Sequence, residues 1–450
     1  MQRKLSWIAA LLLLLPGVAW AQEPDEESLP EELEEEAPGV EPDERWRNLF
    51  RVEATTWALL PRAGVGTKEG YFQVEPTIIF ERGKEFGVDL GTPLRLRMWG
   101  PKGGGIVRRE DWDELSDWGQ VVRALKLGSD NSPLGVWFGQ IDSYTLLSGH
   151  LVRRYAHRAN PNYHPAAGVL TGTLGPVYVE AFTSDILGAR LMGAEVELDL
   201  EHILFGKPEK KSRYTLATSV VHDWGRAGGR TASVTLAHLD AVAVLVIRPE
   251  FEAHVFAGWG GRPGMGGAWG AVAGVGVDAE TSTLDMVLRL EARNQRGGFR
   301  QGFFGADYEL ARFEAAGPSP VPIADAPFPD GYSLSGDAEV GWDAVSYGGP
   351  RAHLKLSLGA EVFSWGRADV DGRVAVQLFE RSLELTLKGL AVGAGKPGAR
   401  YLGAAEVRWR PLGGGLYAMG TGGTLLFPTA EGTLRPGAFA SVGLGVDNAR

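Results

Sequence analysis

The chain has 450 residues, no cysteine, 63 glycines, 14 tryptophans and a formal net charge of −11. The lack of cysteine excludes disulfides, thiolate metal sites and the lipid attachment of a bacterial lipoprotein. Hydrophobic residues at 44% and charged residues at 22% exclude a chain that is disordered throughout, and the length suffices for one large domain.

Residues 1–21 have the features of a signal peptide. Arg3 and Lys4 precede an apolar run, Trp7–Val18, that is too short to span a bilayer comfortably. Ala19 and Ala21 fit the small-x-small rule, so we expect signal cleavage at these residues; an uncleaved membrane anchor is the alternative. The signal predicts export from the bacterial cytoplasm.

Residues 22–45 are expected to form a disordered acidic linker. Positions 22–44 hold twelve acidic residues, no basic residue and four prolines. Like charges repel one another and proline favours extended backbone, so this segment reads either as a spacer on the periplasmic side or as a docking tail for a basic partner. The remainder of the chain is close to neutral, and nothing in it indicates binding to nucleic acid.

From Phe50 to the C-terminus apolar and polar residues alternate with a period of two. His353–Val362 and Ala438–Val446 are clear examples, and Leu284–Arg293 follows the same pattern with one interruption at Val287. This pattern is typical of strands with one apolar and one polar face. Several runs, such as Tyr71–Glu81 and Phe86–Met98, reach the length that crosses a bilayer at a tilt.

The chain has no later apolar segment long enough for a transmembrane helix, so a membrane location requires a closed barrel. Aromatic residues stand where strands end, as in Trp99-Gly100, Trp259-Gly260 and Trp365-Gly366, which favours an aromatic girdle. Residues 46–450 are therefore predicted to be all-β: one large antiparallel transmembrane β-barrel of about 16–20 strands in the outer membrane. An amphipathic helix and a long loop would be inserted near residues 100–165.

Two segments near residues 100–165 break the alternation. In 108–126, Trp112, Leu115, Trp118, Val122 and Leu125 recur at helical spacing, which predicts the amphipathic helix. Residues 143–165 carry three histidines and three arginines without strand periodicity. Insertions of this kind either fold into a barrel as a plug or constriction, or remain surface loops, and the sequence does not decide between the two.

The remaining motifs are weak. Gly393–Gly398 matches G-x-G-x-x-G, but Pro397 and the strand that follows indicate a turn. His150, His157 and His164 recur every seven residues, yet prolines interrupt the stretch and no acidic residue lies near, so we expect solvated or lumen-lining histidines and no metal site. Because no catalytic motif stands out, we predict a protein that is not an enzyme and needs no cofactor.

The polar faces of the strands predict a lumen of mixed charge. Arg293, Lys355 and Arg408 alternate on neighbouring strands with acids such as Glu291 and Glu361, so opposite charges should pair along the wall. The side chains expected to contact a ligand in the lumen are Arg95, Arg97, Arg153, Arg154, Arg158, Arg408 and Arg410.

The signal, the alternation, the aromatic strand ends and the absence of cysteine together resemble porin-like bacterial outer-membrane β-barrel proteins. The 110–115 segment and Arg153-Arg154-Tyr155 look similar to the large barrels of gliding and predatory bacteria. The final residues depart from the pattern, because such barrels usually end on an aromatic residue and this chain ends in Asp447–Arg450.

The resemblance implies an outer-membrane channel for small solutes or for an extended polymer such as polysaccharide. The alternative is a structural barrel that anchors a periplasmic or cell-surface machine through its acidic tail. A third reading is a soluble secreted β-rich protein. The expected partners are outer-membrane lipid and, for the anchor, components of an envelope complex.

Overall fold

The computed structural model describes the chain from residue 46 onward. The described ranges are 46–61, 68–82, 85–100, 105–128, 133–158, 162–188, 190–206, 212–225, 233–264, 266–315, 328–343, 353–379, 382–411, 415–428 and 434–448. The predicted signal peptide, its cleavage residues Ala19 and Ala21, and the acidic linker lie outside these ranges.

The first half of the barrel contains ten β-segments, two 3-10 helices and one α-helix. They are β1 (Trp46–Pro61), β2 (Glu69–Arg82), β3 (Phe86–Gly91), β4 (Leu94–Trp99), η1 (Arg109–Asp111), η2 (Leu115–Val121), β5 (Val122–Leu127), β6 (Leu134–Gly139), β7 (Ala167–Leu174), β8 (Val177–Thr183), β9 (Leu191–Asp199), α2 (Leu200–Phe205) and β10 (Tyr214–Asp223).

The second half contains longer strands and one further helix. They are β11 (Val234–Arg248), β12 (Phe251–Gly261), β13 (Trp269–Glu280), β14 (Leu284–Arg296), α3 (Tyr308–Ala315), β15 (Gly331–Asp343), β16 (His353–Phe363), β17 (Ala368–Leu378), β18 (Leu383–Ala394), β19 (Arg400–Trp409), β20 (Leu416–Pro428) and β21 (Leu434–Asp447).

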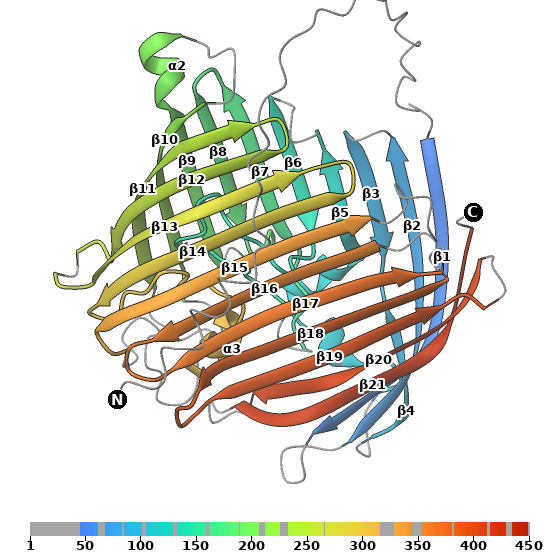
Figure 1. Cartoon of the computed structure of the whole chain (residues 1–450). Coiled ribbons are helices and arrows are strands. Elements are labelled where there is room, and N and C mark those ends of the chain that lie inside the picture. The colour runs from blue at the N-terminus through green and yellow to red at the C-terminus, as the bar shows by residue number, and fades with distance from the viewer. Residues whose placement is uncertain are drawn as a thin grey trace, which may run out of the picture. The chain divides into compact units, whose positions relative to one another are not determined.

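These strands form one closed antiparallel ring (Figure 1). β1 pairs with β2, each strand from β5 onward pairs with the next in sequence, and β21 pairs with β1, so the described strands close into a ring. β3 and β4 both pair with β2 and are two parts of one strand, interrupted at Thr92-Pro93 where proline cannot donate to the ladder. Counted in this way the barrel has 20 strands, which confirms the predicted fold.

The two faces of the wall follow the predicted alternation. On β21 the apolar side chains of Val442, Leu444 and Val446 are exposed on the outer surface, whereas Asp447 is buried. No helix among the described residues is long and apolar enough to span a bilayer. The exposed apolar side chains of the other strands have the same alternation, which gives the barrel a lipid-facing band.

The connections differ between the two ends of the barrel. Those at the end where β1 begins and β21 ends are mostly short, such as 175–176 and 249–250. The three longest connections, 100–121, 140–166 and 297–330, all leave the opposite end. Outer-membrane barrels have short periplasmic turns and long extracellular loops, so we call these the periplasmic and extracellular ends. The architecture is that of a porin-like outer-membrane barrel.

The amphipathic helix predicted over residues 108–126 is wrong. Residues 109–121 form the short 3-10 turns η1 and η2, and Val122–Leu127 is strand β5, which pairs with β3 and β6. Leu115 and Trp118 of the expected apolar face are exposed. Long-range strand pairing closes the ring here, and it overrides the local helical spacing.

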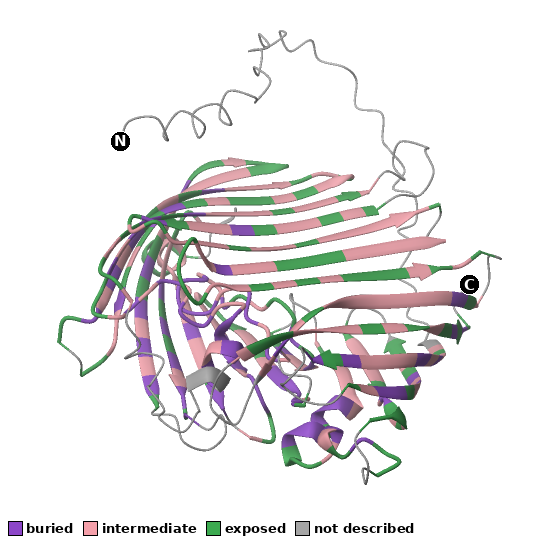
Figure 2. Cartoon of the chain, turned by 90° about the horizontal axis from the view of Figure 1, so that it is seen from below, coloured by how far each residue is buried: buried purple, intermediate pink, exposed green. Residues whose placement is uncertain are grey.

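The interior is filled unevenly (Figure 2). Buried residues occupy the segments that run inside the barrel and the strands around them. A hydrophobic cluster joins residues 146–155 and 299–308 to inward side chains of β8–β11, including Phe182, Val221 and Leu236. The long insertions are therefore packed against one part of the wall.

Candidate functional site

Residues 140–166, which we call the first insertion, connect β6 to β7 and fold inward. Gly139 and Ala167 at its two ends are direct strand partners, so the insertion leaves the wall and returns at one point. Inside, Tyr144 and Tyr155 exchange two backbone hydrogen bonds of 2.9 and 2.8 Å, which forms a short irregular hairpin. Of the two alternatives left open by the sequence, the structure shows the inward one.

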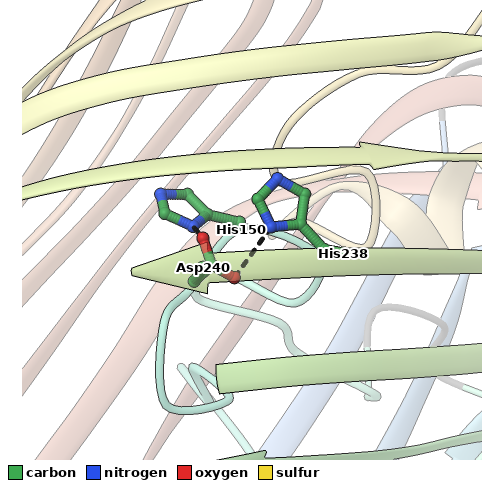
Figure 3. Close-up of side chains that lie close together, drawn as sticks. All are labelled: His150, His238 and Asp240. Carbon is green, nitrogen blue, oxygen red and sulfur yellow. Dashed lines mark hydrogen bonds and ion pairs between the residues drawn. The ribbon is translucent and has the colours of Figure 1, made fainter. Parts of the chain in front are cut away.

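His150, near the tip of this hairpin, is bound to the wall. Its Nδ1 contacts Asp240 of β11, and Nδ1 of His238 contacts the other oxygen of the same carboxylate at 2.7 Å (Figure 3). Nη2 of Arg289 lies 2.6 Å from Nε2 of His150. His150, His238 and Asp240, which we call the buried trio, are each at most 3% exposed. Their hydrogen bonds replace the solvation that burial has removed.

The trio has the composition of a metal site, but its protons are already assigned. Arg289 can only donate, so Nε2 of His150 must accept and its proton must be on Nδ1, which donates to Asp240. A metal ion on Nδ1 would require the ring proton to move to Nε2, where it would face the Arg289 guanidinium, which can only donate. The trio is therefore a hydrogen-bonded attachment of the insertion to the wall.

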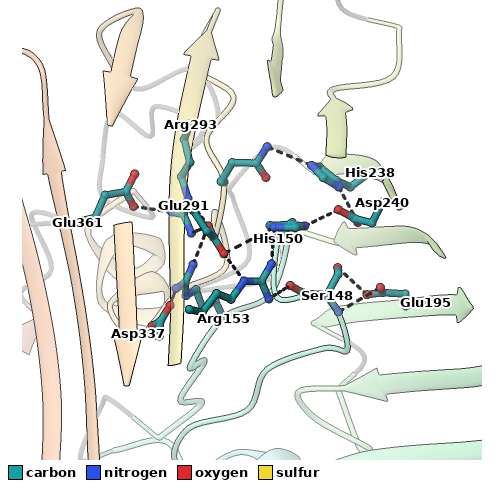
Figure 4. A network of polar contacts seen from close by, with 12 residues as sticks. Ser148, His150, Arg153, Glu195, His238, Asp240, Glu291, Arg293, Asp337 and Glu361 are labelled. Carbon is teal, nitrogen blue, oxygen red and sulfur yellow. Dashed lines mark hydrogen bonds and ion pairs between the residues drawn. The ribbon is translucent and has the colours of Figure 1, made fainter. Parts of the chain in front are cut away.

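The first insertion is held by carboxylates from several strands (Figure 4). Each of these acids faces inward and contacts a polar side chain or backbone group of the insertion. The pairs are Glu180 with Tyr144, Glu195 with Ser148, Asp240 with His150, Glu291 and Asp337 with Arg153, and Asp371 with Arg154. The acids come from β8, β9, β11, β14, β15 and β17, so the insertion crosses the lumen.

Glu291 is the centre of this network. Its carboxylate lies 3.2 Å from Arg153 and 2.5 Å from Arg293, and it also contacts Arg289. Burial and the nearby positive charge of Arg293 lower the pKa of Arg153 to about 10, which still leaves it cationic at neutral pH. Three arginines thus share one buried carboxylate, while Asp337 and Glu361 are second partners of Arg153 and Arg293.

Residues 297–315, the second insertion, also enter the barrel and bind the first one. Backbone hydrogen bonds join Gly302 to His150 at 2.7 Å and Phe304 to Leu151 at 3.0 Å. Tyr155 donates to Glu309 at 2.5 Å, and Arg312 bonds to Asp223 of β10 at 2.6 Å. The second insertion was not predicted from the sequence. Its aromatic residues Phe299, Phe303, Phe304 and Tyr308, close together between two strands, were the available signal.

A cavity of about 670 Å³, which we call the chamber, remains between the first insertion and strands β15–β21. Five basic and three acidic side chains line it: Arg154, Arg158, Lys355, Arg373 and Lys388, and Asp142, Glu339 and Asp371. A smaller cavity of about 90 Å³ lies beside it, and Arg154 and Asp371 line both. These two residues therefore stand at the boundary between the spaces.

Arg154 is held in an unusual conformation. Its φ of 53° lies in the left-handed region, which costs energy for a residue other than glycine. Nε lies 2.7 Å from Asp371 and Nη2 donates to Ser357 at 2.7 Å. Gly359 supplies the space for the guanidinium, because a Cβ there would lie 2.8 Å from Nη1. The surroundings thus hold a strained cation at the boundary between the chamber and the smaller cavity.

The seven arginines predicted to contact a ligand lie in three separate places. Arg95 and Arg97 are near the extracellular end, where Arg95 pairs with Asp111 at 2.8 Å and Arg97 faces Tyr71. Arg408 and Arg410 are near the periplasmic end, paired with Glu384 and Asp447. Arg153, Arg154 and Arg158 belong to the first insertion, and the last two line the chamber. Their contact with a ligand stays a prediction.

The expectation of solvated or lumen-lining histidines is wrong for His150 and His157, which are each 1% exposed. Nδ1 of His157 accepts from Ile141 N–H at 3.3 Å, and Nε2 donates to the carbonyl of Pro165 at 3.0 Å. Burial lowers the pKa of His157 to about 3. The imidazole is therefore neutral and links the two ends of the first insertion.

We expect the stability of the protein to fall as the pH decreases from about 6.5 towards 3. In this range unfolded His157 binds a proton and folded His157 does not, so acid favours the unfolded state by up to about 1.4 kcal/mol per pH unit. His157→Gln keeps one donor and one acceptor without titrating, and it should flatten this slope. Urea unfolding followed by tryptophan fluorescence at several pH values measures it; identical slopes would contradict the assignment.

No family model matches the chain, and no curated protein matches it. Solved porin structures match with 8–10% sequence identity. A BenF-like porin from Pseudomonas fluorescens Pf-5 matches at 10% identity and a TM-score of 0.36, over 90% of this chain and 99% of that chain. Acinetobacter baumannii OccAB3 matches at 8% and 0.36, over 89% and 98%. Pseudomonas aeruginosa OccK2 (OpdF), solved with glucuronate, matches at 9% and 0.34, over 90% and 98%. The porin-like architecture follows from the barrel's own geometry.

Proposed function

We propose that the protein is an outer-membrane channel for small solutes and that it favours solutes with a negative group. The observation that carries this proposal is the chamber, where basic side chains outnumber acidic ones by two. Lys388 pairs with Asp142 at 3.3 Å and Arg154 with Asp371 at 2.7 Å. Arg158, Lys355 and Arg373 form no ion pair with a carboxylate of the described residues. The guanidinium of Arg158 already donates to Pro165 and Gln140, so Lys355 and Arg373 are the cations we expect a solute to meet.

The dimensions favour a small solute over an extended polymer. Two insertions enter the lumen and are bonded to each other and to the wall, and the chamber and the small cavity are spaces beside the first insertion. A volume of about 670 Å³ is in the range of small-molecule sites. An extended polysaccharide would require the first insertion to leave the lumen.

A substitution of Arg373 tests whether the charges of the chamber make the channel prefer anions. Arg373→Gln removes one of the cations without a carboxylate partner, and we expect the anion-to-cation permeability ratio to fall about twofold. Reversal potentials in a planar bilayer under a KCl gradient measure this ratio. Arg373→Lys keeps the charge and is the matched control. A ratio that is unchanged in Arg373→Gln would contradict anion preference set by the chamber.

A further inference from the structure

The second group of possible metal ligands lies on the lumen wall and differs from the buried histidine trio. Glu252 and His254 are on β12, and Asp278 is on β13, all on the inward face. Glu252 and Asp278 are direct cross-strand partners, and His254 is two residues along the same face. Their candidate ligand atoms all lie within 4.8 Å of one another, and all three residues are half-buried. Regular strands therefore hold one imidazole and two carboxylates together at the water-accessible lumen.

The geometry of His254 fits a shared ion better than a direct contact. Its Nδ1 lies 3.5 Å from Oδ2 of Asp278, which is long for a hydrogen bond. Two ligands that each lie about 2.0–2.1 Å from one tetrahedral ion are separated by about 3.4 Å. The ring lies over Gly276, where a Cβ would be 2.1 Å from Nε2. The missing side chain at Gly276 is thus what allows the ring to take this position.

The ligand types point to a transition metal. The imidazole offers a nitrogen ligand, which first-row transition metals bind more readily than Mg²⁺ or Ca²⁺ do, and the two cross-strand carboxylates offer oxygen ligands of opposite charge to the ion. Three protein ligands leave coordination positions open for water. The buried trio differs in its surroundings, because the Arg289 guanidinium faces Nε2 of His150 and would repel a cation.

We propose that Glu252, His254 and Asp278 form a site for one divalent transition-metal ion, on the lumen wall towards the periplasmic end. The bound ion would remove two negative charges from this part of the lumen. Ion binding itself does not depend on what the channel transports.

The test is a Co²⁺ titration of the folded protein in detergent, followed by visible absorption, with Zn²⁺ as competitor in calorimetry. We expect one ion per chain, and at least about tenfold weaker binding in His254→Gln. Gly276→Ala keeps every ligand but displaces the ring, so it should also weaken binding. His353→Gln is the matched control, because His353 also lies on the lumen side but belongs to neither metal-ligand group.

Two results would overturn the proposal: no binding by the native protein, or binding by His254→Gln equal to that of the native protein. A second readout rests on the proposed function. Zn²⁺ added from the periplasmic side should shift the reversal potential towards anions in the native channel and not in His254→Gln. Since the absorption titration needs no current, failure of ion binding and failure of conduction are distinguishable.

Discussion

Deleting residues 143–165 should raise the single-channel conductance at least about threefold, because the first insertion crosses the lumen and obstructs the space next to the chamber. Gly139 and Ala167 are strand partners, so residues 140–142 and 166 can close a tight turn. Planar-bilayer recording measures the conductance, and gel heat-modifiability shows first that the variant is folded. If neither the native protein nor the deletion variant conducts current, the proposed channel function is contradicted. That result would favour the alternative of a structural anchor with an acidic tail.

A milder variant separates loss of the obstruction from loss of the fold. Arg154→Gly removes the guanidinium between the two cavities and places glycine at φ 53°, where it costs no strain. We expect a smaller rise in conductance than after deletion, with the heat-modifiable fold retained. Arg154→Lys keeps the charge in a side chain without the planar fork and should remain close to the native conductance.

Glu291→Gln should destabilise the protein by about 3–5 kcal/mol, because it leaves three arginines around a site that has lost its charge. The expected observation is a lower urea midpoint of unfolding in detergent, measured by tryptophan fluorescence. The effect should be accompanied by release of the first insertion, seen as an increase in current noise.

Glu384→Gln is the control for this prediction. Glu384 also contacts an arginine, at 3.4 Å from Arg408, but its side chain is 28% exposed to the lumen. Water and salt screen such a pair, so the change should be at most about 1 kcal/mol. Equal effects of the two substitutions would show that Glu291 does not hold the network together.

The sequence by itself determined the wall of the barrel. Alternation along His353–Val362 or Ala438–Val446 depends only on successive side chains pointing to opposite faces of the sheet. A strand of this kind can therefore be predicted from residues that are adjacent in the sequence. The same rule placed Arg293, Glu361 and Arg408 on the inner face. Arg408 pairs with Glu384 of the neighbouring strand and Arg293 with Glu361 two strands away, whereas Lys355 has no carboxylate partner among the described residues. The number of alternating runs in the sequence also limited the predicted number of strands to about 16–20.

The contents of the lumen were decided only by the tertiary structure. His150 meets Asp240, and Tyr155 meets Glu309, across 90 and 154 residues. No local period encodes such pairs, because they depend on which strands come opposite an insertion once the ring has closed. The helical spacing of 108–126 misled for the same reason: β5 was required between β3 and β6, and the energy of closing the sheet outweighed local helical preference.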